Sequence, residues 1–264
     1  MIVERFGTGQ AWGMKRKVLA VAAHPDDIEI AMGGTLLRLA EAGWELHYFN
    51  LSCGNGGSLE KDGETTARVR LEEAREGAAR LGARFYPPVA RDLEIVYGVD
   101  LLRKVAAVVR EVNPQMVLTH ALQDYMEDHM ETGRLAVTAA FAKHVPNFAS
   151  DPPLPGAPGD VAVYHAMPHG GCGPLREAVT PDGYVDITGV MERKRHALEA
   201  HQSQQAWLDA SQGMSSYVQA MMETGRDLGR RSGRGEYAEG WRRHLHLGLS
   251  RTEIDPLAEF YNPL

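Results

Sequence analysis

An apolar run that stops abruptly at polar residues constrains the fold of this chain more than any other feature. Residues 18–23 read VLAVAA, which has the length and the bounds of a buried β-strand. The run stops at residues 24–27, HPDD, and residues 33–35, GGT, then open an amphipathic stretch. In open α/β folds, ligands bind just beyond the carboxyl ends of the parallel strands. One imidazole and two adjacent carboxylates therefore lie where a ligand site is expected.

Strand-like and helix-like patterns alternate along most of the chain. Further apolar runs typical of buried strands lie at 45–51, 115–120 and 161–167, and helical periodicity lies at 64–82, 100–112, 129–144 and about 190–201. This alternation favours a parallel sheet that helices cover on both faces. We therefore predict an α/β, Rossmann-like three-layer fold with a mostly parallel sheet and a helical C-terminal extension.

The chain of 264 residues is long enough for one large α/β domain or two small ones. It contains no internal repeat, and the proline-rich loop at 151–159 is followed by another strand pattern. We predict a single domain at 14–264, with a C-terminal segment from about 205. Residues 1–13 are interpreted as an N-terminal extension, and Met14 as an alternative initiator methionine.

Composition excludes several classes of protein. Charged residues make up 24% of the chain and hydrophobic residues 44%, as in ordinary soluble proteins. The net charge of -7 argues against a general nucleic-acid binder. No apolar run approaches the roughly 20 residues of a membrane span. The two cysteines, Cys53 and Cys172, fit a reducing compartment, so we expect a cytoplasmic protein.

Three segments carry a resemblance to a known family. Residues 23–29 read AHPDDIE before the GGT, residues 119–133 read THALQDYMEDHMETG, and residues 197–204 read ALEAHQSQ. In this order the chain resembles the PIG-L/LmbE-like de-N-acetylases. The resemblance implies a metal-dependent hydrolase that removes the N-acetyl group from an N-acetylglucosamine-type amino sugar or conjugate.

Three residues are the expected metal ligands. His24 and Asp27 lie three residues apart at a turn, and His129 follows a different strand. Two imidazoles and one carboxylate leave an open position for water, as in catalytic Zn²⁺ sites. Fe²⁺ or another divalent ion also fits this set. Each residue alone would more commonly be a hydrogen-bonding or capping group, so the prediction depends on the three together.

Asp26 is the expected general base. The resemblance gives the first aspartate of HPDD this role, and a carboxylate beside a ligand can take a proton from the water nucleophile bound to the metal. It would then deliver this proton to the leaving amine. The alternative is that Asp26 only orients Asp27 or an imidazole.

One position departs from the family pattern. Where the family has the first histidine of HPDH, this chain has Met126, whose thioether cannot donate a hydrogen bond to the oxyanion. Four residues are candidate replacements: His201, His169, Tyr125 and His120. His201 lies in the ALEAHQSQ segment, so we rank it first and predict that it is catalytic.

Arg70, Asp124 and His169 are expected at the substrate. The resemblance aligns the family's RxxE with residues 70–73 and directs its arginine to the substrate's hydroxyls. The glycine-rich loop at 54–58 follows a strand and is expected nearby. Asp124 could instead hold a ligand imidazole, and Arg70 could be a surface residue.

Other functions stay open. Met126 would suit a non-catalytic sugar-binding relative, and another metallohydrolase, such as a phosphoesterase, could use the same ligands. A dinucleotide-binding protein is disfavoured because Gly33-Gly34 lacks the GxGxxG spacing. The aromatic and methionine side chains after residue 205 could form a homo-oligomer contact or pack in the core, and the sequence favours the two alternatives equally. These side chains are Trp207, Tyr217, Met221, Met222 and Trp241.

Overall fold

The computed structural model describes residues 15–204 and 217–263. Within them lies an eight-stranded sheet of order β3-β2-β1-β4-β5-β7-β6-β8. Five strands run parallel: β1 (Lys17–Ala22), β2 (Glu45–Asn50), β3 (Arg84–Tyr86), β4 (Met116–Thr119) and β5 (Ala162–Ala166). The remaining pairings are antiparallel and involve β6 (Gly183–Asp186), β7 (Ala238–Arg243) and β8 (Tyr261–Pro263). The predicted α/β fold with a mostly parallel sheet is confirmed.

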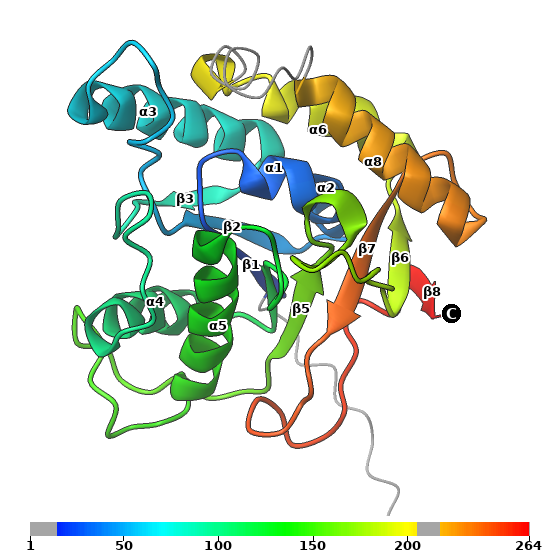
Figure 1. The fold of residues 1–264 in the computed structure, drawn as a ribbon. Helices are drawn as coiled ribbons and strands as arrows, with labels where there is room; N and C mark the ends of the chain where they lie inside the picture. Colours follow the sequence, from blue (N-terminus) through cyan, green and yellow to red (C-terminus); the bar gives the residue numbers. More distant parts are fainter. Residues whose placement is uncertain (1–14, 205–216, 264) are drawn as a thin grey trace, which may run out of the picture.

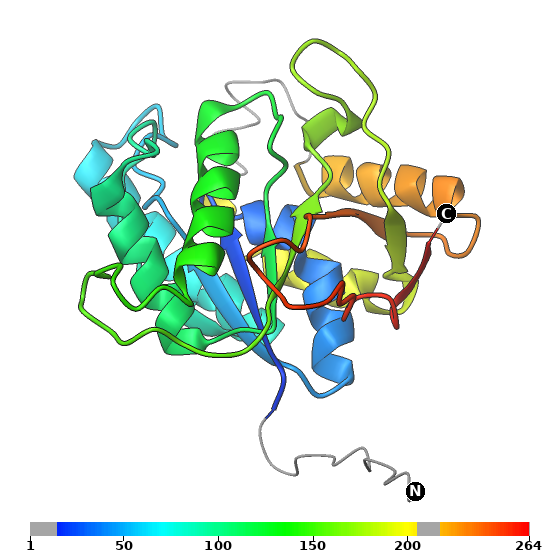
Figure 2. The same ribbon diagram turned by 90° about the horizontal axis from the view of Figure 1, so that it is seen from below.

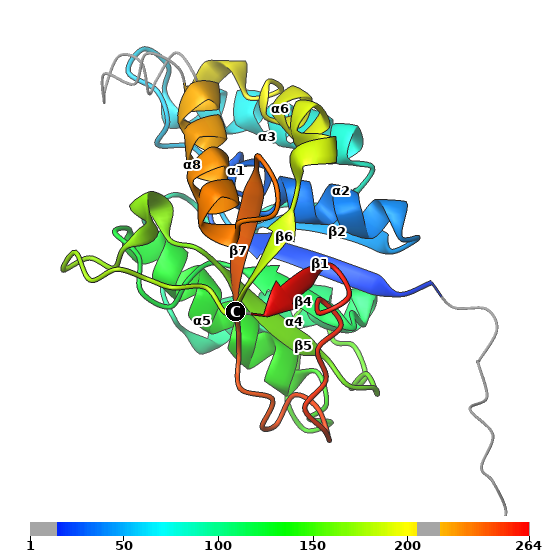
Figure 3. The same cartoon turned by 90° about the vertical axis from the view of Figure 1, so that its right-hand side faces the viewer.

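Helices cover both faces of the sheet (Figures 1 and 3). One face carries α1 (Asp27–Ala31), α2 (Gly33–Glu41), α3 (Gly63–Leu81), α6 (Met191–Leu198) and α8 (Tyr217–Ser232). The other face carries α4 (Val99–Val112) and α5 (Glu127–Ala142), which lie toward the viewer in Figure 2. Two short 3₁₀ turns, η1 (His169–Gly171) and η2 (Thr188–Val190), follow β5 and β6. No helix in the described ranges has the length and apolar character needed to cross a membrane.

The position of β1 in the sheet, covered by helices on both faces, explains why its sequence is apolar without interruption. Val18, Ala20 and Ala22 pack into the core beneath α1, α2 and α3, whereas Leu19 and Val21 pack against α4 and α5. A strand that is buried on both faces needs apolar residues at every position. The other strands and helices predicted before residue 205 are present, with ends shifted by at most three residues.

The C-terminal segment differs from the prediction. It contains the expected helix, α8, but the strands β7 and β8 also join the sheet, and the sequence pattern had not indicated them. Tyr217, Met221 and Trp241 are buried in the core, so the packing alternative holds for these three. Trp207 lies outside the described residues. The indole N–H of Trp241 donates to Thr35 Oγ1 at 2.9 Å, which ties β7 to the GGT motif.

Candidate active site

The candidate site lies where the order of the strands reverses. β1 pairs with β2 on one side and with β4 on the other, so the loops after β1 and β4 leave the sheet side by side. Such a switch point opens a crevice beyond the carboxyl ends of the strands. Residues 24–27 follow β1, and residues 120–129 follow β4. The topology therefore brings the first two motifs together.

His24, Asp27 and His129 form a cluster that could hold a metal ion. One ligand atom from each lies within 4.8 Å of the others. Asp27 Oδ2 is 3.4 Å from His24 Nδ1, and Asp27 Oδ1 is 3.5 Å from His129 Nε2. The three predicted ligands are thus brought together from the two segments that follow β1 and β4, with Asp27 at the start of α1 and His129 in the first turn of α5.

Two further carboxylates hold the imidazoles from outside the cluster. His24 Nε2 donates to Asp128 Oδ2 at 3.1 Å, and His129 Nδ1 donates to Asp124 Oδ1 at 3.0 Å. These bonds direct His24 Nδ1 and His129 Nε2 toward Asp27, as carboxylates behind metal-binding histidines commonly do. Asp128 escaped the sequence analysis, although its position next to His129 in the motif was a usable signal.

The electrostatics of the cluster fit a divalent cation. Burial by itself would lower the pKa of His24, but its hydrogen bonds to Asp128 and Asp27 raise that pKa to about 10. Burial would raise the pKa of Asp27, yet the charges of His129 and His120 hold it well below its ordinary value. A carboxylate kept anionic between two imidazoles is a donor set suited to Zn²⁺ or Fe²⁺.

Asp26 lies beside the cluster in a strained conformation. Its φ is 103°, a region that a non-glycine residue rarely adopts and that is common at functional sites. Asp26 Oδ2 accepts a hydrogen bond from Tyr217 Oη at 3.1 Å and lies 3.4 Å from Arg70 Nη2. Burial raises the pKa of the Asp26 carboxyl to about 6, although Arg70 acts in the opposite direction. A carboxyl that titrates near neutral pH is suited to proton transfer.

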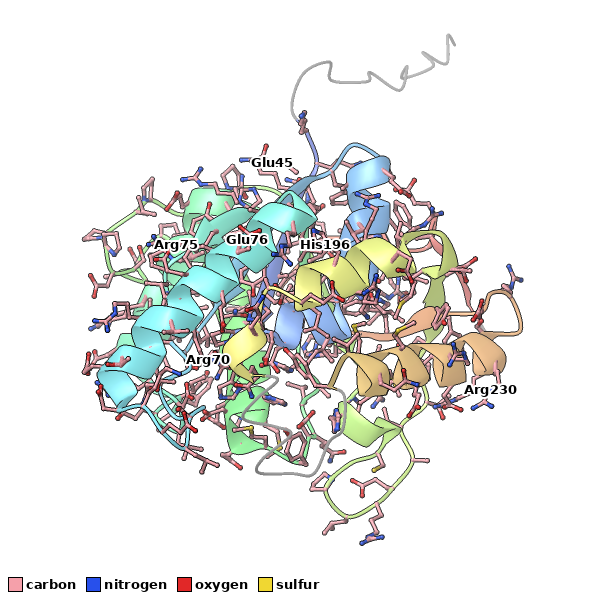
Figure 4. All side chains as sticks on the ribbon, turned by 90° about the horizontal axis from the view of Figure 1, so that it is seen from above. Glu45, Arg70, Arg75, Glu76, His196 and Arg230 are labelled. Carbon is pink, nitrogen blue, oxygen red and sulfur yellow. The ribbon has the colours of Figure 1, made fainter. Side chains whose placement is uncertain are left out.

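Arg70 lines the cavity but mainly supports the loop that carries Asp26. Its side chain is buried, and Nη2 donates to the Pro25 carbonyl at 2.6 Å. In Figure 4 it lies on the inner side of α3, whereas Arg75 lies on the exposed side. The glycine-rich loop covers it closely. A Cβ at Gly54, whose φ is +74°, would lie 2.7 Å from Arg70 Cδ. Gly56 of the same loop lines the cavity, close to where the sequence predicted it.

The structure separates the four candidate replacements for the missing histidine. Tyr125, His169 and His120 line the cavity. His201 is not among the described residues that line it, because its ring is fully buried with Nε2 3.1 Å from Glu29 Oε1. The predicted first choice is therefore the one of the four candidates that does not line the cavity.

The cavity itself has a volume of about 670 Å³. Its walls include the loops after β1, β4 and β5 together with one face of α8. Tyr217 and Met221 belong to this face, and sequence reasoning did not place them at the site. No local pattern could have done so, since Tyr217 meets Asp26 across 191 residues of chain.

Comparisons with known proteins identify the family. Residues 19–140 match the family profile described as PIG-L, GlcNAc-PI de-N-acetylase. A diacetylchitobiose deacetylase of Thermococcus kodakarensis is 30% identical over 197 residues, which cover 72% of this chain and 70% of that protein. The chain belongs to the PIG-L family. The resemblance drawn from the three motifs is confirmed.

The PIG-L relatives of this chain do not all catalyse one reaction. A 4-oxalmesaconate hydratase of Pseudomonas putida is 33% identical over 199 residues, covering 72% of this chain and 75% of that protein. The crystal structure of GalB, the 4-carboxy-2-hydroxymuconate hydratase of Pseudomonas putida, superposes with a TM-score of 0.74 at 26% identity. It covers 91% of this chain and 99% of that one. Membership of the family therefore leaves both deacetylation and hydration to be weighed.

Proposed function

We propose that this protein is a metal-dependent N-deacetylase of an N-acetylglucosamine-type sugar or conjugate, which releases acetate and a free amine. One observation carries the proposal. The buried carboxyl of Asp26 lies in the same cavity as the candidate ligands His24, Asp27 and His129. Amide hydrolysis needs an electrophile for the carbonyl oxygen and a group that moves a proton from water to nitrogen.

The residues divide these tasks between them. His24, Asp27 and His129 would hold a Zn²⁺ or other divalent ion, which when bound polarises a carbonyl and lowers the pKa of water. Asp26 takes a proton from the attacking water and gives it to the amide nitrogen as the C–N bond breaks. Arg70 and Tyr217 both contact Asp26 Oδ2. We therefore assign the proton transfer to Oδ1.

The oxyanion also needs a donor from the protein, because Met126 cannot supply one. In our proposal this donor is the hydroxyl of Tyr125. Its ring meets that of His129 edge-on at 5.6 Å between centroids, and its side chain lines the cavity. The ring of His169 lies 5.7 Å from that of Tyr125, which supports a role for His169 at the substrate. His201 is buried against Glu29 and its charge acts on the Asp26 carboxyl, so we assign it a positioning role.

A hydratase is the second candidate function, because the 4-oxalmesaconate hydratase of Pseudomonas putida is 33% identical to this chain. The name of that relative's substrate denotes a polycarboxylate, which needs cationic partners. Apart from histidines, the cationic residues among the described lining residues are Arg70, Lys194 and Arg231. Arg70 lies against Asp26, Lys194 is paired with Glu239 at 2.6 Å, and Arg231 lies 4.0 Å from Asp227. Carboxylates such as Glu223 and Asp227 also line the cavity, which favours a neutral substrate.

The test combines metal analysis with two reactions. Wild type and Asp26→Asn would be assayed for bound metal, for amine release from a panel of N-acetylglucosamine conjugates, and for hydration of an unsaturated polycarboxylate by absorbance. We expect about one equivalent of metal in both proteins. Amine release should be roughly 1,000-fold slower in Asp26→Asn. Asp100→Asn is the matched control, because Asp100 is an exposed aspartate of α4 outside the cavity wall, so this variant should keep full activity.

Two results would overturn the proposal. Hydration without amine release would make the protein a hydratase. Failure to bind any divalent ion, with retained sugar binding, would favour a non-catalytic sugar-binding relative.

A further inference from the structure

A leucine at the cavity has a backbone conformation that leucine rarely adopts. In residues 15–204 and 217–263, four non-glycine residues have a positive φ: Asp26, Leu93, Asn113 and Arg176. Asn113 ends α4, where a left-handed residue is ordinary. Leu93, with a φ of 62°, is the third residue of a turn in which Glu94 N donates to the Arg91 carbonyl at 3.1 Å, a position that usually takes glycine, and it lies outside the core. It lines the cavity and is 76% exposed.

The contacts of the Leu93 backbone explain how this conformation is held. Leu93 N donates to Asp128 Oδ2 at 2.7 Å, and the same oxygen accepts the hydrogen bond from the candidate ligand His24. The preceding residue, Asp92, accepts from Ser52 Oγ at 2.7 Å and from Gly56 N at 2.8 Å. The loop is thus fixed on both sides and attached to the candidate metal site.

The side chain of Leu93 receives no comparable support. At 76% exposure it contributes little to the core, so burial does not offset the conformational cost of a left-handed leucine. A glycine would adopt this φ without strain. Single exposed leucines are common on protein surfaces, but they seldom combine a strained backbone with a place in the wall of a cavity. An outlier of this kind points to a function of the side chain.

We propose that Leu93 is a specificity-determining residue that contacts an apolar substituent of the substrate. This inference rests on the proposed function for the amino-sugar part of the ligand. An isobutyl side chain forms no hydrogen bond, so its contribution comes from apolar area removed from water. Tyr125, 62% exposed and also in the cavity wall, adds an aromatic surface nearby. The substituent is an alkyl or aryl group, carried either as the aglycone or as an N-acyl chain longer than acetyl.

The experiment measures binding in the full-length, zinc-loaded protein with Asp26→Asn, which prevents turnover. Calorimetry compares the phenyl and methyl glycosides of N-acetylglucosamine in one arm, and N-hexanoyl- and N-acetylglucosamine in the other. We expect about a tenfold preference for the apolar ligand in one arm, reduced to about twofold by Leu93→Gly. The arm that shows the preference identifies whether the aglycone or the acyl chain is recognised.

Arg176→Gly is the matched control, since it also relieves a positive φ but lies outside the cavity wall. It should keep the preference, and both glycine variants should melt at or above the temperature of the parent protein. The inference is overturned if neither arm shows a preference, or if Leu93→Gly leaves it unchanged. It is also overturned if Leu93→Gly melts lower, because the side chain would then have a structural role. Amine release by wild type tests the proposed function separately, since binding preference does not depend on turnover.

Discussion

Two sets of buried charges line the same cavity and differ in how their atoms are satisfied. Lys194 Nζ lies 2.6 Å from Glu239 Oε1, and the Glu239 carboxylate also accepts from Gly34 N and Thr35 N. This pair, from α6 and β7, completes its bonding within the protein and holds the start of α2. In the other set, the outer atoms of the two imidazoles are bound and the inner atoms converge on Asp27.

The difference teaches that a buried charge does not by itself mark a functional site. An ammonium paired with a carboxylate offers no metal-binding donor set, because the ammonium has no lone pair, whereas two imidazoles and a carboxylate with ligand atoms within 4.8 Å of one another do. The candidate metal site meets the second description, and the Lys194–Glu239 pair meets the first. The following changes test this distinction, from the largest expected effect to the smallest.

Replacing Asp27 should abolish metal binding. In Asp27→Ala the central carboxylate is lost, so we expect bound metal to fall to near zero and amine release to fall by at least about 1,000-fold. Metal analysis and the amine assay measure the two effects, and circular dichroism checks the fold. A variant that still binds one equivalent of zinc would show that the metal lies elsewhere.

Removing one partner of the satisfied pair should instead affect stability. Lys194→Met leaves the Glu239 carboxylate buried without its cation, which should reduce the free energy of unfolding by about 3 kcal/mol. Urea unfolding measures the loss, while the metal content should stay that of wild type. Arg230→Met is the control, because Arg230 lies on the exposed side of α8 (Figure 4) and, within residues 15–204 and 217–263, forms an ion pair only with Asp227. Loss of metal in Lys194→Met would erase the distinction between the two sets.

The carboxylates behind the imidazoles should have an intermediate effect. Asp124→Asn keeps the size of the side chain but removes the charge that orients His129, so we expect metal affinity to fall about 10- to 100-fold. Competition with a chelator measures the affinity. The control is Glu131→Gln. Glu131 lies on α5 with His129, accepts from Tyr97 N and contacts neither imidazole in the bonds described, so this variant should bind metal as wild type does. An equal loss of metal affinity in the two variants would argue against the positioning role of Asp124.

A third buried charge donates to an amide and forms no ion pair with a carboxylate of the described residues. Lys143 is buried, its Nζ donates to Asn113 Oδ1 at 2.8 Å, and burial lowers its pKa to about 8 from 10.5. The unfolded chain therefore binds more protons between these values, and stability gains from this group as the pH rises from 8 to 10.5. Lys143→Met should raise the free energy of unfolding at pH 7 by about 1–2 kcal/mol. This advantage should shrink across that window, and an unchanged difference at pH 10 would contradict it.

The sequence predicted the parts of the molecule that depend on local pattern. The uninterrupted apolar run of β1 predicted a strand buried on both faces, and the helical stripe at 64–82 predicted α3. The C-terminal strands were missed because β7 reads AEGWRR, in which Glu239 and Gly240 obscure the strand pattern. Glu239 is buried there only because Lys194 and the start of α2 compensate its charge.

By itself, the sequence determined the fold class, the family and the three candidate metal ligands. These follow from short stretches, since a ligand that directly follows a parallel strand must lie at the carboxyl edge of the sheet. Only the tertiary structure decided which groups surround those ligands. Tyr217 reaches Asp26, Leu93 is strained over the cavity, and His201 is buried away from it. Such contacts join residues far apart in the chain, and they depend on the order of strands and the packing of helices, which no local pattern encodes.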